Sequence, residues 1–205
     1  MEGRAVRVVS WNLLYRSGAA LDEIVRLVRE EQPDLLLMQE TTDRIDALPD
    51  RIGGHYARDP LPGRIYGLAT WSREPLLDPP SVLKLQPGFI FDRICQIITL
   101  DGFAVANVHL AHGQLVNRRQ LADICQVLPA RAAVLGDCNL IGPPQVPGFR
   151  DVGPDQGTHA LGGLASGRWD RCLVRRLNCD RSEVLVRGSS GHRPIAIELS
   201  VPKGA

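Results

Sequence analysis

Polar side chains of the kinds used in catalysis stand at the ends of several apolar segments of this chain. The clearest case is AAVLGDCNL, where Asp137 and Asn139 follow a short apolar run and a glycine. Residues i and i+2 of an extended chain point the same way, so these two side chains are expected to share a face. Cys138 is then expected to point away and pack. A carboxylate and an amide on one face can hold a water molecule or a hard cation.

Other predicted strands end in the same way. The further residues of this kind are Asn12, Glu40, His109, Asp170 and His192. Each alone has a structural explanation: Asp170, for example, could pair with Arg168 or Arg171. Together, two histidines, three carboxylates and two asparagines predict one polar cleft. Their oxygen atoms favour Mg²⁺ or Mn²⁺, and the imidazoles add acid–base or phosphate-binding capacity.

The elements that must position these residues follow from hydrophobic patterning. Helical periodicity predicts helices over 21–32 and 114–128. Alternating or continuous apolar segments predict strands at 4–11, 34–40, 66–72, 81–85, 93–100, 103–110, 131–137, 168–174, 182–188 and 194–199. The stretch 142–168 is rich in glycine and proline and is predicted to be a loop. Many strands with few helices predict an α/β protein in which two sheets pack together with helices outside.

Composition limits the class of protein. A chain of 205 residues fits one domain spanning 1–205, and 24 basic against 23 acidic residues exclude a strongly basic nucleic-acid binder while leaving room for a local basic patch. The N-terminus shows no signal peptide, and no stretch approaches the roughly 20 apolar residues of a membrane helix. The five cysteines have no metal-type spacing. We expect a cytoplasmic monomer with reduced thiols and no membrane contact.

Six motifs resemble, in order, those of the endonuclease/exonuclease/phosphatase superfamily, which has a deoxyribonuclease-I-like fold. They are SWN, LLLMQE, NVHL, LGDCN, THALGGLASGRWDRCLV and SSGHRPIAIEL, and the match runs from about Val8 to Leu199. The resemblance implies a four-layered α/β sandwich, with two packed mixed or antiparallel sheets and helices outside. It also implies hydrolysis of phosphate esters with Mg²⁺ or Mn²⁺.

The resemblance implies a role for each matched residue. Glu40 would bind the cation directly, with Asn12 helping to hold it. Asp137 would orient or deprotonate the attacking water. Asn139 would contact the phosphate and help to fix that water.

The remaining matched residues would act on the phosphate. His109 is similar to a histidine that contacts the phosphate or the leaving-group side. Asp170 would fix the tautomer of His192, and His192 would stabilise the charged phosphoryl centre. Arg93 matches a family arginine that we assign to substrate binding, and Thr158 matches a threonine with a structural role.

The chain departs from the family pattern at two positions that often carry acids. Gly191 stands directly before the histidine of the last motif, where the family has Asp, and Leu14 follows the SWN asparagine by two residues. These departures predict weaker metal binding or the loss of a second metal position. Asp151 or Asp155 is a candidate replacement, and Glu74 is a candidate acidic partner for the NVHL histidine.

The leading hypothesis is a divalent-metal-dependent phosphoesterase that hydrolyses a phosphodiester bond by metal-assisted in-line attack of water, as nucleases do. One alternative is a phosphomonoesterase that acts on a small phosphorylated metabolite. Another is a catalytically weakened scaffold, which Gly191 would favour. The expected partner is a phosphate-ester substrate, with nucleic acid as one candidate. Arg118-Arg119 and Arg175-Arg176 are further candidate phosphate contacts, although a solvated helix face and a hairpin tip explain them more simply.

Overall fold

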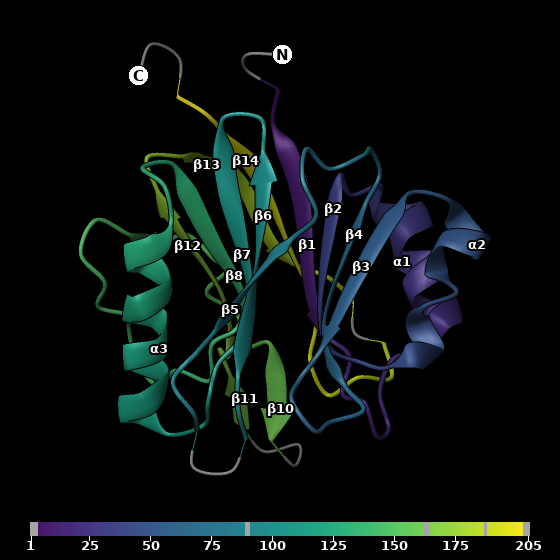
Figure 1. The fold of residues 1–205 in the computed structure, drawn as a ribbon, viewed down its shortest axis with the longest axis horizontal. Coiled ribbons are helices and arrows are strands. Elements are labelled where there is room, and N and C mark those ends of the chain that lie inside the picture. Colours follow the sequence, from purple (N-terminus) through teal and green to yellow (C-terminus); the bar gives the residue numbers. More distant parts are fainter. Residues whose placement is uncertain (1–3, 89–90, 162–164, 187, 203–205) are drawn as a thin grey trace.

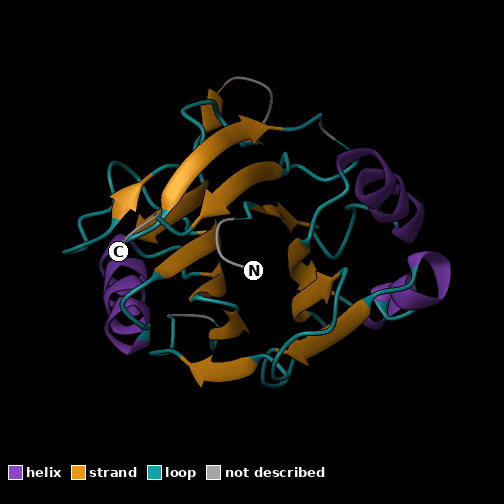
Figure 2. Cartoon of the chain, turned by 90° about the horizontal axis from the view of Figure 1, so that it is seen from above, coloured by secondary structure: helices purple, strands orange, loops and turns teal. Residues whose placement is uncertain are grey.

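The computed structural model describes residues 4–88, 91–161, 165–186 and 188–202. Two six-stranded sheets pack face to face, and helices cover their outer faces (Figure 1, Figure 2). Helices α1 (Leu21–Glu31) and α2 (Leu48–Ile52) lie on one side, and α3 (Gln114–Val127) lies on the other (Figure 1). The four-layered α/β sandwich expected from the sequence is therefore confirmed. In the part of the chain that is described, no helix is long and apolar enough to cross a membrane.

The first sheet has the strand order β13-β14-β1-β2-β4-β3. Its strands are β1 (Val6–Asn12), β2 (Leu35–Thr41), β3 (His55–Pro60), β4 (Gly67–Ser72), β13 (Asn178–Val184) and β14 (Ile195–Ser200). Only β1 and β2 pair in parallel within it, and α1 is the crossover between them. The helix predicted at 21–32 and the strands predicted at 4–11 and 34–40 thus form a strand–helix–strand unit.

The second sheet has the order β5-β6-β7-β8-β12-β9. Its strands are β5 (Ser81–Lys84), β6 (Ile94–Leu100), β7 (Phe103–His109), β8 (Ala132–Asp137), β9 (Arg150–Asp151) and β12 (Asp170–Arg175). Here β7 and β8 are the parallel pair, joined by α3. A two-stranded ribbon of β10 (His159–Leu161) and β11 (Ala165–Gly167) lies at the lower end of the sandwich (Figure 1).

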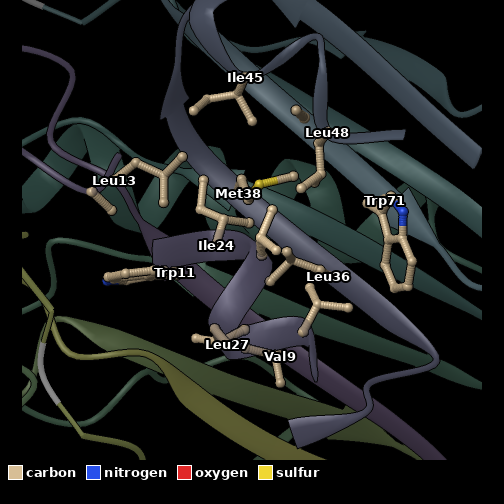
Figure 3. Close-up of a cluster of buried hydrophobic side chains, with 14 of the residues drawn as sticks. Val9, Trp11, Leu13, Ile24, Leu27, Leu36, Met38, Ile45, Leu48 and Trp71 are labelled. Carbon is tan, nitrogen blue, oxygen red and sulfur yellow. The ribbon is translucent and has the colours of Figure 1, made fainter. Parts of the chain in front are cut away.

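Alternation along β1 divides the apolar core into layers. Val8 packs between the sheets, whereas its neighbour Val9 faces the helices together with Trp11. Figure 3 shows this outer layer, in which Ile24 and Leu27 lie against Val9 and its neighbours. The central strands are apolar on both faces because both faces are covered.

A buried polar layer joins the two sheets. Asn107 Nδ2 donates to the backbone carbonyls of Met38, at 3.3 Å, and Ala69, at 3.1 Å, both in the opposite sheet. Its Oδ1 accepts from Gln39 Nε2 at 2.8 Å, and its Nδ2 also donates to Gln96 Oε1 at 3.0 Å. Buried amides need such partners, so this layer fixes how β2 and β7 lie across the sandwich.

Some elements differ from the sequence prediction. The stretch 142–168 is not all loop: it contains β9, β10 and β11, which are too short to show a period. The strand predicted at 182–188 runs instead over 178–184, because the polar segment NCDRSEV is held by backbone pairing with β14. The edge strand β3 and the short elements η1 (Asp43–Ile45) and α2 carry no strong apolar pattern and were not predicted.

Gly136 allows β7 and β8 to approach closely just before the polar strand ends. Its φ is +139°, and a Cβ atom there would lie 2.0 Å from the carbonyl oxygen of Val108. We predict that Gly136→Ala lowers the free energy of unfolding by at least about 3 kcal/mol, as measured by urea denaturation, because backbone must move. Gly63→Ala is the control: its φ is +66° with nothing within 4 Å, and we expect a loss of about 1 kcal/mol. Equal losses in the two variants would contradict this account.

Candidate active site

The polar strand ends meet at one edge of the sandwich, the lower edge in Figure 1. Parallel pairing brings the end of β1 beside the end of β2 and the end of β7 beside the end of β8, where Asn12 pairs with Gln39 and His109 pairs with Asp137. The antiparallel strand β12 begins at this edge, with Asp170 opposite Asp137. His192 lies in the segment that enters β14. Strand direction and register therefore gather these residues.

Asp137 is the point at which the site converges. Its Oδ2 accepts a hydrogen bond from Asn12 Nδ2 at 2.9 Å and lies 3.5 Å from His109 Nε2 and 3.7 Å from His192 Nε2. All four side chains are buried. One carboxylate oxygen thus faces three segments that are far apart in the sequence. Burial raises the pKa of the Asp137 carboxyl, and the nearby His192 opposes that rise.

His192 forms a dyad with Asp170. The distance from His192 Nδ1 to Asp170 Oδ2 is 2.9 Å. Burial acts to lower the pKa of His192, but the carboxylates of Asp170 and Asp137 outweigh it and raise the pKa to about 9. His192 therefore carries a positive charge at neutral pH. Asp170 does not pair with Arg168 or Arg171, both of which bind Asp151 instead.

His109 has the opposite electrostatic character. Burial and the charge of Arg93 lower its pKa well below the ordinary value, so the imidazole is neutral at pH 7. The site thus holds one charged and one neutral imidazole around the same carboxylate. Glu74, the acidic partner that the sequence suggests for His109, is instead exposed on the loop after β4. The carboxylate beside His109 is that of Asp137.

Asn139 is held by helix α3 rather than by an extended strand. Strand β8 ends at Asp137, and Asn139 has a φ of 49°, so the simple alternation expected for residues 137 and 139 stops at the strand end. Its carbonyl accepts from Gln114 Nε2 and Asn117 Nδ2, each at 2.8 Å. Its Nδ2 donates to the carbonyl of Leu110 at 3.0 Å. Cys138 is buried in the core beneath α3, as a packing thiol would be.

Glu40 and Arg93 stand beside Asp137. Glu40 has a φ of 55° at an irregularity of β2, and its Oε2 accepts from the backbone N–H of Tyr15 at 3.2 Å. Burial raises the pKa of Glu40, and Asp137 adds to the rise. Arg93 is only 3% exposed; burial lowers its pKa, whereas Asp137, Tyr66 and Glu40 favour its charged form. A buried carboxylate and a partly buried one close together favour binding of a cation between or beside them.

The donor set fits a hard cation that keeps much of its water. The Glu40 carboxylate and the amide oxygen of Asn12, which also accepts from Leu14 N at 3.1 Å, are oxygen donors of the kind Mg²⁺ binds. Within the described residues, no group of three or more His, Cys, Asp and Glu side chains is arranged to hold a metal. Mg²⁺ is commonly held by one or two carboxylates together with substrate phosphates, so a site with so few ligands suits it.

Gly191 and Leu14, the two positions where the family pattern often has acids, face each other in the structure. A Cβ atom on Gly191 would lie 2.8 Å from Leu14 Cδ1, so an apolar contact fills this part of the site. Neither proposed replacement lies here. Asp151 is bound by Arg168 and Arg171, and Asp155 is exposed. No substitute carboxylate comes from these two residues.

Sequence reasoning missed an aromatic group next to Glu40. The rings of Tyr15 and Tyr66 stack with centroids 4.2 Å apart. Near them, the guanidinium of Arg64 lies 4.3 Å from the ring centroid of Phe91. Aromatic residues scattered in loops carry no periodic signal, although Tyr15 follows the SWN motif by only a few residues.

The comparison with protein families decides the family. Residues 9–190 match the model described as "Endonuclease/Exonuclease/phosphatase family". The chain belongs to this family. Its enzymes are generally dependent on a divalent metal, and membership supports a phosphoester hydrolase. A search of curated proteins gives no significant match.

Solved structures of family members share this fold. The endonuclease/exonuclease/phosphatase from Bacteroides vulgatus has a TM-score of 0.77 at 16% identity, over 97% of this chain and 100% of that chain. Humanized D. rerio TDP2 with 14 mutations has a TM-score of 0.77 at 16% identity, over 96% and 99%. D. rerio TDP2 complexed with single strand DNA product has a TM-score of 0.76 at 14% identity, over 96% and 99%.

The charge of His192 can be measured without substrate. We predict that its imidazole titrates with a pKa of about 9 in the metal-free chain, followed by ¹⁵N NMR with chelator present. Asp170→Asn removes the carboxylate that raises this value, so the pKa falls by at least one unit. His55 is exposed at the opposite end of the first sheet, and its imidazole signals at neutral pH should have the same chemical shifts in both proteins. An unchanged pKa of His192 in Asp170→Asn would contradict the dyad.

Proposed function

We propose that this protein is a divalent-metal-dependent phosphodiesterase that acts on nucleic acid. The observation that carries the proposal is the convergence of the partly buried Glu40 carboxylate with the buried Asp137 carboxylate, a charged His192 and a neutral His109. A phosphoryl group needs an activated water, neutralisation of its negative charge and stabilisation of the leaving oxygen. This set of residues can supply all three.

Asp137 orients the attacking water and accepts its proton. Its carboxylate is buried, and its raised pKa makes it a better proton acceptor than an exposed aspartate. The water oxygen forms a bond to phosphorus, the proton passes to Asp137, and the bond to the leaving oxygen breaks on the opposite side. Asn12, whose Nδ2 donates to Asp137 Oδ2, keeps that carboxylate oriented.

We assign stabilisation of the negative charge that develops on the phosphoryl oxygens to His192, Asn139 and Arg93. His192 is held protonated by Asp170, so its positive charge is in place before reaction. Asn139 Nδ2 has a second N–H besides the one donated to Leu110. Neutral His109, whose Nε2 lies 3.5 Å from Asp137 Oδ2, would offer a ring N–H to the phosphate or to the leaving oxygen.

Glu40 and Asn12 would hold the cation. When bound, Mg²⁺ or Mn²⁺ supplies a Lewis acid that polarises a phosphoryl oxygen. The proposal assigns a single cation to this chain because Leu14 and Gly191 leave an apolar contact where further acids often stand.

The aromatic residues beside Glu40 support a nucleic acid as substrate. Tyr15 is half-buried and stacks on the buried Tyr66, while the exposed guanidinium groups of Arg16 and Arg64 lie over the rings of Tyr15 and Phe91, so this corner of the site offers cationic groups of the kind that bind a nucleic-acid backbone. One structural neighbour is described as a complex with single strand DNA product. A single-stranded phosphodiester is therefore the substrate we propose.

The test is an activity panel with Mg²⁺, Mn²⁺ or chelator. The substrates are single-stranded DNA, plasmid DNA, RNA, a generic phosphodiester and a phosphomonoester. We expect cation-dependent cleavage of single-stranded nucleic acid, with Asp137→Ala and His192→Ala each at least about 100-fold slower because proton transfer and charge stabilisation are lost. Circular dichroism checks that each variant folds, and His55→Ala, far from the site, should match the parent.

The outcomes separate the alternatives. Faster hydrolysis of the phosphomonoester than of any diester would replace the proposal with a phosphomonoesterase. Cation binding without turnover on any substrate would favour the scaffold. Full activity in folded Asp137→Ala and His192→Ala would contradict the assigned roles.

A further inference from the structure

The segment before β10 ties together the two halves of the Asp170–His192 dyad. Thr158 Oγ1 accepts from the backbone N–H groups of Trp169, at 3.1 Å, and Asp170, at 3.0 Å. Its carbonyl accepts from the backbone N–H of Arg193 at 2.7 Å. Thr158 is fully buried. One residue thus holds the backbone of Asp170 and the backbone next to His192.

The next residue, His159, lies directly against His192. Their backbones form an isolated antiparallel bridge. Their ring centroids are 4.2 Å apart, with the ring planes at 87°. His159 also lies near Trp169, with ring centroids 6.5 Å apart. His159 was not among the predicted site residues.

The His159 ring also lies next to Gly191. A Cβ atom on Gly191 would lie 3.6 Å from His159 Nε2 and 2.8 Å from Leu14 Cδ1. At 3.6 Å such an atom would be in ordinary van der Waals contact with the ring, so the His159 imidazole and Gly191 are direct neighbours beside the dyad.

The other contacts of His192 do not fix the tilt of its ring. Trp11 Nε1 donates to its carbonyl at 3.0 Å, and its N–H donates to Ser190 Oγ at 3.1 Å, so these contacts hold the backbone. Asp170 holds one ring atom, Nδ1, and Asp137 Oδ2 faces Nε2 at 3.7 Å, which is beyond hydrogen-bond distance. A ring attached at Nδ1 and Cβ can still rock, and a second ring packed at nearly a right angle opposes that motion.

We propose that His159 is a positioning residue for His192: its ring packs over Gly191 and keeps the Nε2 edge of His192 directed at Asp137 and the phosphoryl group. The kinetic part of this inference rests on the proposed function. The packing of His159 on His192 does not, so it can be tested in the absence of turnover.

The experiment compares His159→Ala, which removes the ring, with His159→Phe, which keeps a flat ring without nitrogens. His55→Ala is the matched control. For His159→Ala we expect kcat to fall about 10- to 100-fold with KM within about twofold of the parent, because a displaced group slows the chemical step more than binding. His159→Phe should keep kcat within about threefold.

The second readout is ¹⁵N NMR of the His192 imidazole in metal-free protein. In His159→Ala the His192 ring signals should broaden and its Nδ1–H should exchange faster with solvent, whereas His159→Phe should retain the parent spectrum. If His159→Ala does not fold, His159→Leu, which is apolar but not flat, takes its place in both measurements.

Three results would overturn the inference. Unchanged kcat and an unchanged His192 spectrum without the ring would mean that His159 does not position His192. A raised KM at constant kcat would make His159 a substrate contact. Equal losses in the Ala and Phe variants would mean that the imidazole nitrogens, not the packed ring, are required. If the parent hydrolyses nothing, the proposed function fails, and the NMR comparison still decides this inference.

Discussion

The candidate site depends on one buried carboxylate oxygen. Asp137 Oδ2 takes a hydrogen bond from Asn12 and stands within 4 Å of the Nε2 atoms of both His109 and His192. A buried carboxylate is stable only with such partners, so Asp137 and its neighbours stabilise one another. The surroundings also give the two histidines different charges. Asp170 and Asp137 raise the pKa of His192 and keep it protonated, whereas burial and Arg93 lower the pKa of His109 and keep it neutral. Catalytic sites typically contain two groups of the same type whose environments give them very different pKa values.

Two features of the fold position the residues around Asp137. The parallel pairs β1–β2 and β7–β8 deliver their last residues to one edge, and Gly136 lets β7 and β8 meet closely there. Behind that edge, Asn107 binds backbone carbonyls of the facing sheet and Gln39. Gln39 is directly followed by Glu40, and Asn107 is two residues before His109. The packing of the two sheets through Gln39 and Asn107 therefore also sets the distance between Glu40 and His109.

Much of this could be predicted from the sequence, where the signal is local. Apolar runs ending in Asn12, Glu40, His109 and Asp137 indicated the strands and the edge on which they end, since strand period and turn chemistry are short-range properties. The failures are long-range. Strand β13 is polar and forms through pairing with β14, and β9 to β11 are too short to show a period. His159 could not be chosen, because its importance comes from lying against His192 and Gly191, which only the folded chain brings near.

The central claim is that a cation held at Glu40 lies beside both imidazoles of one site. The most direct measurement is titration of the ¹⁵N-histidine-labelled chain with Mn²⁺, whose unpaired electrons broaden NMR signals of nearby nuclei. The account predicts that the imidazole signals of His109 and His192 broaden at Mn²⁺ levels that leave the distant His55 sharp, and that Glu40→Gln abolishes this selectivity. Equal broadening of His55, or selective broadening that persists in Glu40→Gln, would contradict it.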